Sequence, residues 1–218
     1  MKELLKTDFM GHYGILSSIC VDAYVAEGYD NIKFDLDDGE GVLSEGCGKL
    51  TVANGNGTFD LLHYEGLIGQ CKSPKAFLKG LKRCDYVLWH KNVEGAFLLC
   101  EITSAYGKRD NLEKPVKDFE GGKLQKAEKQ LEVSLKTLMD VPKIKEYIDR
   151  YAMKVCLMAY RVFPYEEEII NDFVKPFQRF SLVEMQETKN NGAELESSSI
   201  NKMGFSFRRI AHGAVFQI

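Results

Sequence analysis

Two stretches of the chain carry hydrophobic residues at steps of three or four, the spacing of one face of an α-helix. In residues 8–27 the repeating positions are Phe9, Tyr13, Leu16, Cys20 and Ala23/Tyr24. In residues 122–140 they are Leu124, Ala127, Leu131, Leu135 and Leu138. We expect an amphipathic helix over each stretch, and shorter helices over residues 73–83 and 165–174.

Strand patterns fill much of the remaining chain. β-prone segments separated by glycine-bearing turns predict hairpins within residues 31–64. Apolar runs at residues 85–90 and 96–103 are joined by a short polar loop, which predicts antiparallel neighbours. A polar loop is expected at residues 189–201. Further strands are predicted at residues 151–163, 181–186 and 203–218.

The fold class indicated is α+β, a central mixed β-sheet flanked by helices. No repeat or linker divides residues 1–218 into more than one domain.

The composition narrows the class of protein. With 44% hydrophobic and 28% charged residues, the chain is typical of folded soluble proteins and unlike collagen-like or disordered ones. No apolar run approaches the roughly 20 residues that span a bilayer, and charges within the first ten residues argue against a signal peptide. Six cysteines without a CxxC pair and four histidines without ligand spacing do not indicate zinc. We therefore expect a cytoplasmic protein without a membrane partner.

The net charge of −3 is unevenly distributed. Residues 22–66 hold ten acids and two lysines, whereas residues 72–145 hold sixteen lysines and arginines against ten acids. A basic middle section is what a polyanionic partner requires, because neutralised phosphates release counterions. A solvated helix face of mixed charge explains the same pattern without any partner.

Three polar residues stand where the two central strands are expected to meet. Glu101 and Thr103 share one face at the end of the second strand, because alternate strand residues point to the same side. Asp85 opens the preceding strand, and the five-residue loop places it opposite that end. Two carboxylates that meet repel one another unless a cation lies between them. Mg²⁺ takes such oxygen ligands together with waters and phosphate oxygens, so the pair predicts a Mg²⁺ site.

The arrangement resembles the PD-(D/E)XK, or restriction-endonuclease-like, nuclease superfamily. That family's core runs helix, three antiparallel-paired strands, helix, strand, with an aspartate on the second strand and an acid-x-lysine triplet on the third. Here CDYVLW carries Asp85 and FLLCEIT carries Glu101, ahead of the helix in GGKLQKAEKQLEVSLKTL and the strand in YAMKVCLMAYRVF. As topology the resemblance covers most of the chain, and as a motif it covers residues 84–138. Cys84 replaces the family's variable proline, and Thr103 stands at the position of its lysine.

The resemblance implies metal-dependent hydrolysis of phosphodiester bonds in nucleic acid, with DNA favoured over RNA. Mg²⁺, or Mn²⁺, would be held by Asp85, Glu101 and the backbone carbonyl of Ile102. Because Thr103 has no amine, a positive group must come from elsewhere. Family members sometimes supply a lysine or glutamine from the following helix, which here corresponds to Lys126 and Gln130, with Lys123 in reserve.

Three further expectations accompany the resemblance. An acid from the first helix, Asp22 or Glu27, would complete the metal shell. A homodimer is conceivable because the family's enzymes often dimerise. Basic residues that flank the site in sequence could grip phosphates: Lys72, Lys75, Lys79, Lys82, Arg83, Lys108 and Arg109.

Other interpretations stay open at the level of sequence. Asp85 could pair with Arg83 or cap a turn, and a salt bridge to a helix lysine would satisfy Glu101. A catalytically inactive module of the same fold, binding nucleic acid or a protein, is the first alternative. An unrelated α+β interaction protein, in which the two acids do not approach one another, is the second.

Overall fold

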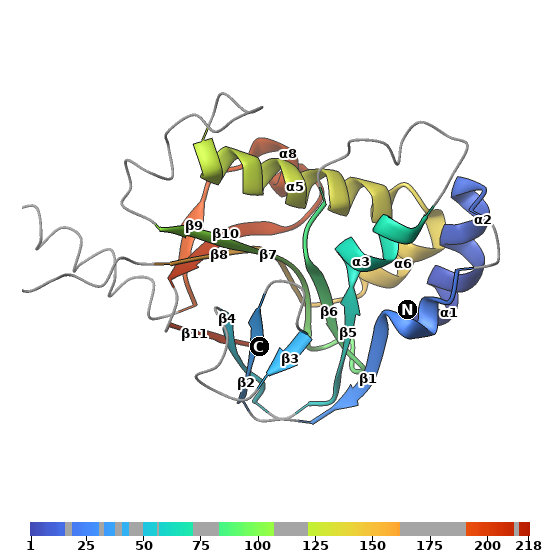
Figure 1. The fold of residues 1–218 in the computed structure, drawn as a ribbon, viewed down its shortest axis with the longest axis horizontal. Helices are drawn as coiled ribbons and strands as arrows, with labels where there is room; N and C mark the ends of the chain where they lie inside the picture. The colour runs from blue at the N-terminus through green and yellow to red at the C-terminus, as the bar shows by residue number, and fades with distance from the viewer. Residues whose placement is uncertain are drawn as a thin grey trace, which may run out of the picture.

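The structure, a computed structural model, has three stacked layers: helices, a central sheet and a smaller second sheet (Figure 1). It describes residues 1–15, 19–30, 33–37, 41–43, 50–55, 57–71, 83–106, 122–161, 191–211 and 214–218. The α+β class predicted from the sequence is confirmed.

The central sheet has seven strands in the order β1-β5-β6-β7-β8-β10-β9. Its strands are β1 (Val25–Tyr29), β5 (Phe59–His63), β6 (Tyr86–His90), β7 (Ala96–Tyr106), β8 (Met153–Arg161), β9 (Ala193–Leu195) and β10 (Ser206–Ala211). Strands β1, β5, β6 and β7 pair antiparallel, and β8 lies parallel to both β7 and β10. The predicted antiparallel pairing of the two central strands is therefore confirmed.

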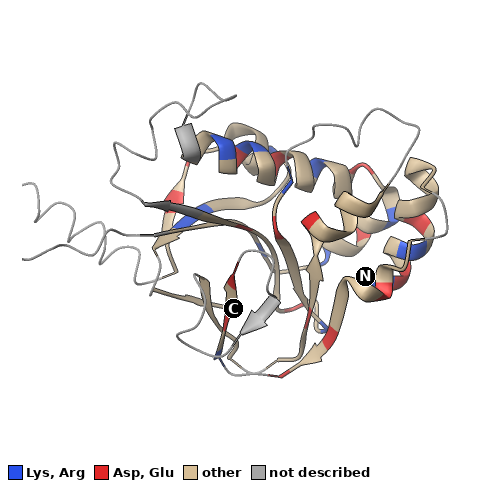
Figure 2. Ribbon diagram, in the orientation of Figure 1, with Lys and Arg blue, Asp and Glu red and all other residues tan. Residues whose placement is uncertain are grey.

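Helices α5 (Gly122–Met139) and α6 (Pro142–Asp149) connect β7 to the parallel strand β8. A parallel pair requires such a crossover, so α5 runs back over the sheet from the end at which β7 finishes (Figure 1). Leu131, Leu135 and Leu138, three of the predicted apolar positions, are fully buried against the sheet. Basic and acidic residues are interspersed along the rest of α5 (Figure 2). The helix predicted over residues 122–140 is confirmed, whereas α6 was not predicted.

Among the described residues, further helices lie on the same face of the central sheet as α5. They are α1 (Lys2–Leu4), a π-helical turn (Leu5–Phe9), α2 (Met10–Tyr13), α3 (Tyr64–Gln70) and α8 (Ser198–Lys202), and a short 3-10 turn (Val21–Ala23) precedes β1. Their apolar residues join α5, α6 and one face of the central sheet in a single hydrophobic core. None of the described helices has the length and apolar character of a bilayer span.

The opposite face of the central sheet packs against a four-stranded sheet of order β11-β4-β2-β3. Its strands are β2 (Lys33–Asp37), β3 (Gly41–Leu43), β4 (Leu50–Ala53) and β11 (Val215–Gln217). Phe34, Leu36 and Phe216 bury their side chains against Leu61 and Leu98 of the central sheet. Within the described residues, helices thus flank one face of the central sheet and strands cover the other.

Two predicted elements are wrong. The helix expected over residues 8–27 begins at Lys2 and ends at Gly14, whose φ of 62° is a left-handed helix ending, and Val25–Tyr29 instead pairs with β5. The strand expected over residues 203–218 divides into β10 and β11, which belong to different sheets.

The predicted loop at residues 189–201 contains β9 and the start of α8 in its described part. Apart from Arg83, the predictions at residues 73–83, 165–174 and 181–186 lie outside the described residues.

Candidate functional site

Asp85 immediately precedes β6, and Glu101 follows Cys100 on the neighbouring strand β7. The paired register of the two strands reaches as far as Tyr86 and Cys100, and the Asp85 amide donates to the Cys100 carbonyl. Opposed residues of an antiparallel pair share a face of the sheet. Val87 and Leu99, a pair of this register, belong to the core beneath the helices, so Glu101, two residues after Leu99 on β7, faces the helical layer. Asp85 lies near it, because its side chain accepts from the amide of Ile102, the residue after Glu101.

Neighbouring main-chain groups hold Asp85 in place. Its amide donates to the carbonyl of Cys100 (3.0 Å), and its carbonyl accepts from the amides of Tyr64 (2.9 Å) and Glu65 (3.3 Å) at the start of α3. Oδ2 of its side chain accepts from the amide of Ile102 (2.5 Å). These bonds fix the carboxylate against β7 at Ile102, the residue between Glu101 and Thr103.

Both side chains are buried, and a buried ionised acid is costly unless it is compensated. Asp85 is 5% exposed and Glu101 is 7% exposed. Their field reaches the neighbouring thiol: burial raises the pKa of Cys84 well above its usual value, and the charges of Glu101 and Asp85 act in the same direction. Both acids therefore lie close enough to Cys84 to act on the pKa of its thiol.

A metal with oxygen ligands suits this donor set. The amide of Ile102 points towards Asp85, and since the N–H and C=O of one strand residue face the same neighbour, its carbonyl points to that side as well. Two carboxylates and a carbonyl are oxygen donors of the kind that Mg²⁺ binds, with waters completing the octahedron. No cluster of three or more His, Cys, Asp or Glu side chains suited to a metal occurs among the described residues, so this set depends on the carbonyl.

Thr103 and the residues of α5 surround this pair. Thr103 is half-buried, faces the helices like Glu101 and lies beside Tyr160 of β8. Gln130 donates its amide to the carbonyl of Arg83 (2.9 Å) and so contacts main chain next to the site. Lys126, one turn closer to the end at which β7 finishes, makes no hydrogen bond or ion pair with any described residue. The side chain of Lys123 lies outside the described residues.

Arg209 is a basic residue of this sheet that sequence reasoning missed. Register places it beside Met158, which in turn lies beside Glu101, so the three share a row across β10, β8 and β7. Phe207 and Ala211 show that this side of β10 faces the helices. Two strand spacings, about 10 Å, separate the backbones of Arg209 and Glu101. No local pattern signals this proximity, because more than a hundred residues separate the two positions.

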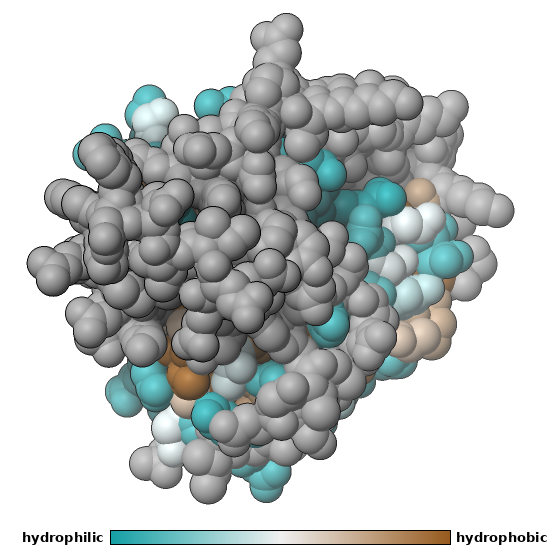
Figure 3. Space-filling view, turned by 60° about the vertical axis from the view of Figure 1, so that its left-hand side comes forward, coloured by the Kyte–Doolittle hydropathy of each residue, from teal (hydrophilic) through white to brown (hydrophobic). Residues whose placement is uncertain are grey.

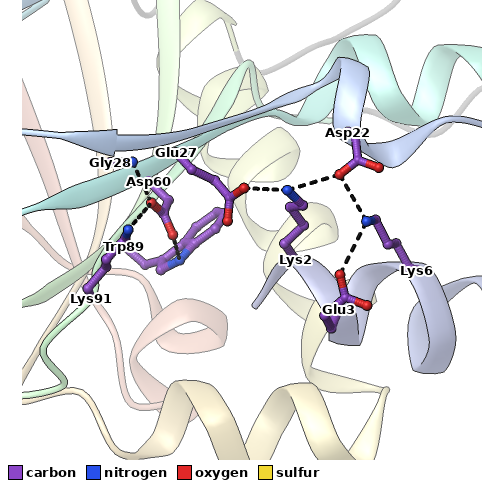
Figure 4. Close-up of polar contacts among 9 residues, drawn as sticks. All are labelled: Lys2, Glu3, Lys6, Asp22, Glu27, Gly28, Asp60, Trp89 and Lys91. Carbon is purple, nitrogen blue, oxygen red and sulfur yellow. Dashed lines mark hydrogen bonds and ion pairs between the residues drawn. The ribbon is translucent and has the colours of Figure 1, made fainter.

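Other charged residues of the predicted site are engaged elsewhere. Asp22 and Glu27, the acids expected from the first helix, form ion pairs with Lys2, and Asp22 also pairs with Lys6 (Figure 4). Nε of Arg83 lies 3.9 Å from Oε1 of Glu65. The remaining basic residues that were expected to grip phosphate lie outside the described residues: Lys72, Lys75, Lys79, Lys82, Lys108 and Arg109.

Asp60 provides a contrast, because it is a buried carboxylate with evident structural partners. Its oxygens accept from the amide of Gly28 (2.9 Å) and the indole N–H of Trp89 (3.1 Å), and Lys91 lies 3.9 Å away (Figure 4). These contacts tie β1, β5 and the end of β6 together. Asp60 is therefore a structural acid, and it serves as a matched reference for Asp85 and Glu101.

Comparisons with protein-family models, with curated proteins and with solved structures find no match to this chain. Functional assignment therefore depends on the geometry of Asp85, Glu101 and the residues around them.

Proposed function

We propose that this chain is a metal-dependent nuclease that hydrolyses phosphodiester bonds of nucleic acid, with DNA as the favoured substrate. The observation that carries the proposal is that two buried acids lie close together, since the Asp85 side chain accepts from the amide of Ile102, the residue that follows Glu101 on β7. The order of β5, β6, β7, α5 and β8 around them is the order of the PD-(D/E)XK core, which supports the same reading.

Asp85, Glu101 and the carbonyl of Ile102 would hold Mg²⁺ or Mn²⁺. When bound, the ion polarises the scissile phosphate and lowers the pKa of a water ligand. Asp85 contributes a carboxylate whose direction is fixed by the Ile102 amide, and Glu101 faces it from β7. The Thr103 hydroxyl, on the same face as Glu101, is suited to orienting a water but cannot neutralise charge.

Positive charge near the site supports a polyanionic substrate. Arg209 lies in the row of Glu101, and Lys126 lies on α5 without a described partner. The sequence of residues 72–82, immediately before Arg83, contains four lysines and no acid. Lysines there would add the phosphate contacts that position a nucleic acid. The coloured atoms in Figure 3 are mainly teal, that is hydrophilic, and Met153 is the exposed large hydrophobic residue among those described.

Cleavage assays with carboxamide variants test the proposal. Single-stranded DNA, duplex DNA and RNA are incubated with the full chain and Mg²⁺ or Mn²⁺. We expect cleavage that chelation stops and that Asp85→Asn and Glu101→Gln each reduce at least about a hundredfold, because each removes a charged metal ligand. Asp60→Asn and Glu132→Gln, a buried and a partly exposed acid outside the site, should retain activity. Activity that survives Glu101→Gln would refute the assignment.

Thr103→Lys separates the enzyme from the inactive module. An inactive module of the nuclease fold would bind nucleic acid without cutting it, because the motif lysine is missing at position 103. If the unaltered chain binds nucleic acid without cutting it and Thr103→Lys creates cleavage, the inactive module is the correct interpretation. If the unaltered chain cleaves, the positive group comes from elsewhere, and Arg209→Gln and Lys126→Gln identify which residue supplies it.

A further inference from the structure

Two side chains of helix α5 hydrogen-bond to a single peptide group, the one that joins Arg83 to Cys84. One bonds to its C=O and the other to its N–H. The side-chain amide of Gln130 donates to the Arg83 carbonyl (2.9 Å). The Cys84 amide donates to the hydroxyl of Ser134 (2.8 Å). Gln130 and Ser134 are one helical turn apart, so they present these groups from the same side of α5.

The hydroxyl of Ser134 is oriented for this role. Its proton is donated to the carbonyl of Gln130 (2.7 Å), which leaves the oxygen to accept from Cys84. Ser134 is 1% exposed and Cys84 is fully buried, so water cannot substitute for the bond. Serine is not favoured inside helices unless its side chain has a specific partner, and the Cys84 amide is that partner here.

The next two peptide groups along the chain are held as well. The Asp85 amide donates to Cys100 of β7, and the Asp85 carbonyl accepts from Tyr64 and Glu65 of α3. Three consecutive peptide groups around Asp85 are therefore fixed by three different elements. The contacts from α5 are the ones made by side chains, and so they are the ones that substitution can remove.

We propose that Gln130 and Ser134 are positioning residues that act through the Arg83–Cys84 peptide group to aim the Asp85 carboxylate at the end of β7. That peptide group directly precedes the one that carries the Asp85 amide, so α5 holds the chain where it enters the contact between Asp85 and the Ile102 amide. Gln130 thus acts on the site through main chain rather than by touching substrate. The consequence for metal binding rests on the proposed function, whereas the positioning itself does not.

The Ile102 amide reports the positioning directly, because it donates to Asp85. Its hydrogen exchange is measured by NMR on the full chain, relative to that of Leu99 on the same strand. Gln130→Glu keeps the size of the side chain but replaces the donor with an oxygen, and Ser134→Ala removes the acceptor. We expect each variant to speed Ile102 exchange about tenfold relative to Leu99, which corresponds to the loss of one hydrogen bond. The double variant should add little, since both residues hold one peptide group.

Thr137→Ala is the matched control on α5. Like Ser134, Thr137 is buried and donates its hydroxyl to the carbonyl four residues earlier (2.7 Å), but its other side-chain hydrogen bond is to the side chain of Tyr64 rather than to the Arg83–Cys84 peptide group. It should leave the Ile102-to-Leu99 exchange ratio unchanged. An unchanged ratio in Gln130→Glu and Ser134→Ala, or an equal change in Thr137→Ala, overturns the positioning role.

Titration with Mn²⁺ then separates the two proposals. If the unaltered chain binds Mn²⁺, Ser134→Ala, which changes no charge, should weaken binding about threefold to thirtyfold while Thr137→Ala does not. Unchanged Mn²⁺ affinity in Ser134→Ala contradicts a positioning role that matters to the site. If the unaltered chain binds no Mn²⁺ but the Ile102 exchange responds as expected, the nuclease assignment fails and the positioning of Asp85 stands.

Discussion

At the residue scale, His90 shows how a buried polar side chain is satisfied without a chemical role. Its Nδ1 accepts from the amide of Ala96 (2.8 Å), so the proton lies on Nε2, which contacts Oδ1 of Asn54 (2.9 Å). The ring thereby links the end of β6 to the residue that follows β4 in the second sheet. Burial lowers the pKa of His90, because a charged imidazole would lose its hydration.

The lowered pKa of His90 predicts loss of stability in mild acid. The unfolded chain accepts a proton near pH 6.5, but the folded chain resists it, since protonated Nδ1 cannot accept from Ala96. The free energy of unfolding should be constant above that pH and fall below it, by no more than about 1.4 kcal/mol per pH unit for one proton. Urea titrations between pH 5 and 8 measure this. The slope of the free energy of unfolding against pH should flatten in His90→Gln and persist in His12→Gln. An unchanged slope in His90→Gln would show that His90 is not the group responsible.

Gly95 is constrained by the same imidazole. A Cβ at position 95 would overlap the ring of His90, which its two hydrogen bonds hold in place. We expect Gly95→Ala to lower the free energy of unfolding by about 1–3 kcal/mol, the usual cost of overpacking. Gly69→Ala is the control, because a Cβ there meets nothing within 4 Å and alanine favours the helix. Urea unfolding compares the two; equal effects would show that position 95 has room.

At the scale of elements, hydrophobic periodicity predicted correctly a helix whose own residues supply the buried face, such as α5. The three- and four-residue spacing of Leu131, Leu135 and Leu138 was sufficient for α5, since one face of that helix is buried. The same spacing failed in residues 8–27, because Gly14 ends the helix and pairing with β5 makes Val25–Tyr29 a strand. Neither the pairing partner nor the backbone conformation of a glycine is encoded in a hydrophobic repeat.

The contacts of Asp60 predict how much the stability of three strands depends on one buried acid. Asp60→Ala would leave the amide of Gly28 and the indole N–H of Trp89 without an acceptor. Two unsatisfied buried donors should lower the free energy of unfolding by about 2–4 kcal/mol. Urea unfolding followed by the fluorescence of Trp89, the only tryptophan, measures the loss. Asp22→Ala, which breaks only exposed ion pairs, should stay close to the unaltered protein, and an Asp60→Ala variant that does the same would contradict this role.

At the scale of the whole molecule, the two sheets share one hydrophobic core and should unfold together. Phe216 of β11 packs with Phe34 and Leu36 of its own sheet and with residues of the central sheet. We expect Phe216→Ala to cost about 3–5 kcal/mol while unfolding stays a single transition. Far-UV circular dichroism and Trp89 fluorescence, recorded along the same urea titration, check this. Separate midpoints for the two signals would indicate independent sheets.

The whole-molecule scale also explains which parts of the candidate site the sequence could reveal. Asp85 and Glu101 were found because a short loop forces their strands to pair. Arg209 was not found, since it reaches the same row only through the parallel pairing of β8 with β10. Gln130 was predicted as a site residue from its place on the helix, and its bond to the Arg83 carbonyl depends on how α5 docks, which no spacing specifies.

Direct titration with Mn²⁺ tests the central claim, that Asp85 and Glu101 together hold a divalent ion. Electron paramagnetic resonance of the full chain measures free and bound ion without requiring any substrate. We predict one bound ion per chain, with affinity at least about tenfold weaker in Asp85→Asn and in Glu101→Gln, a loss of about 1.4 kcal/mol or more. Asp60→Asn and Glu132→Gln should bind as the unaltered chain does. Absence of binding, or binding that all four variants share, would contradict the account.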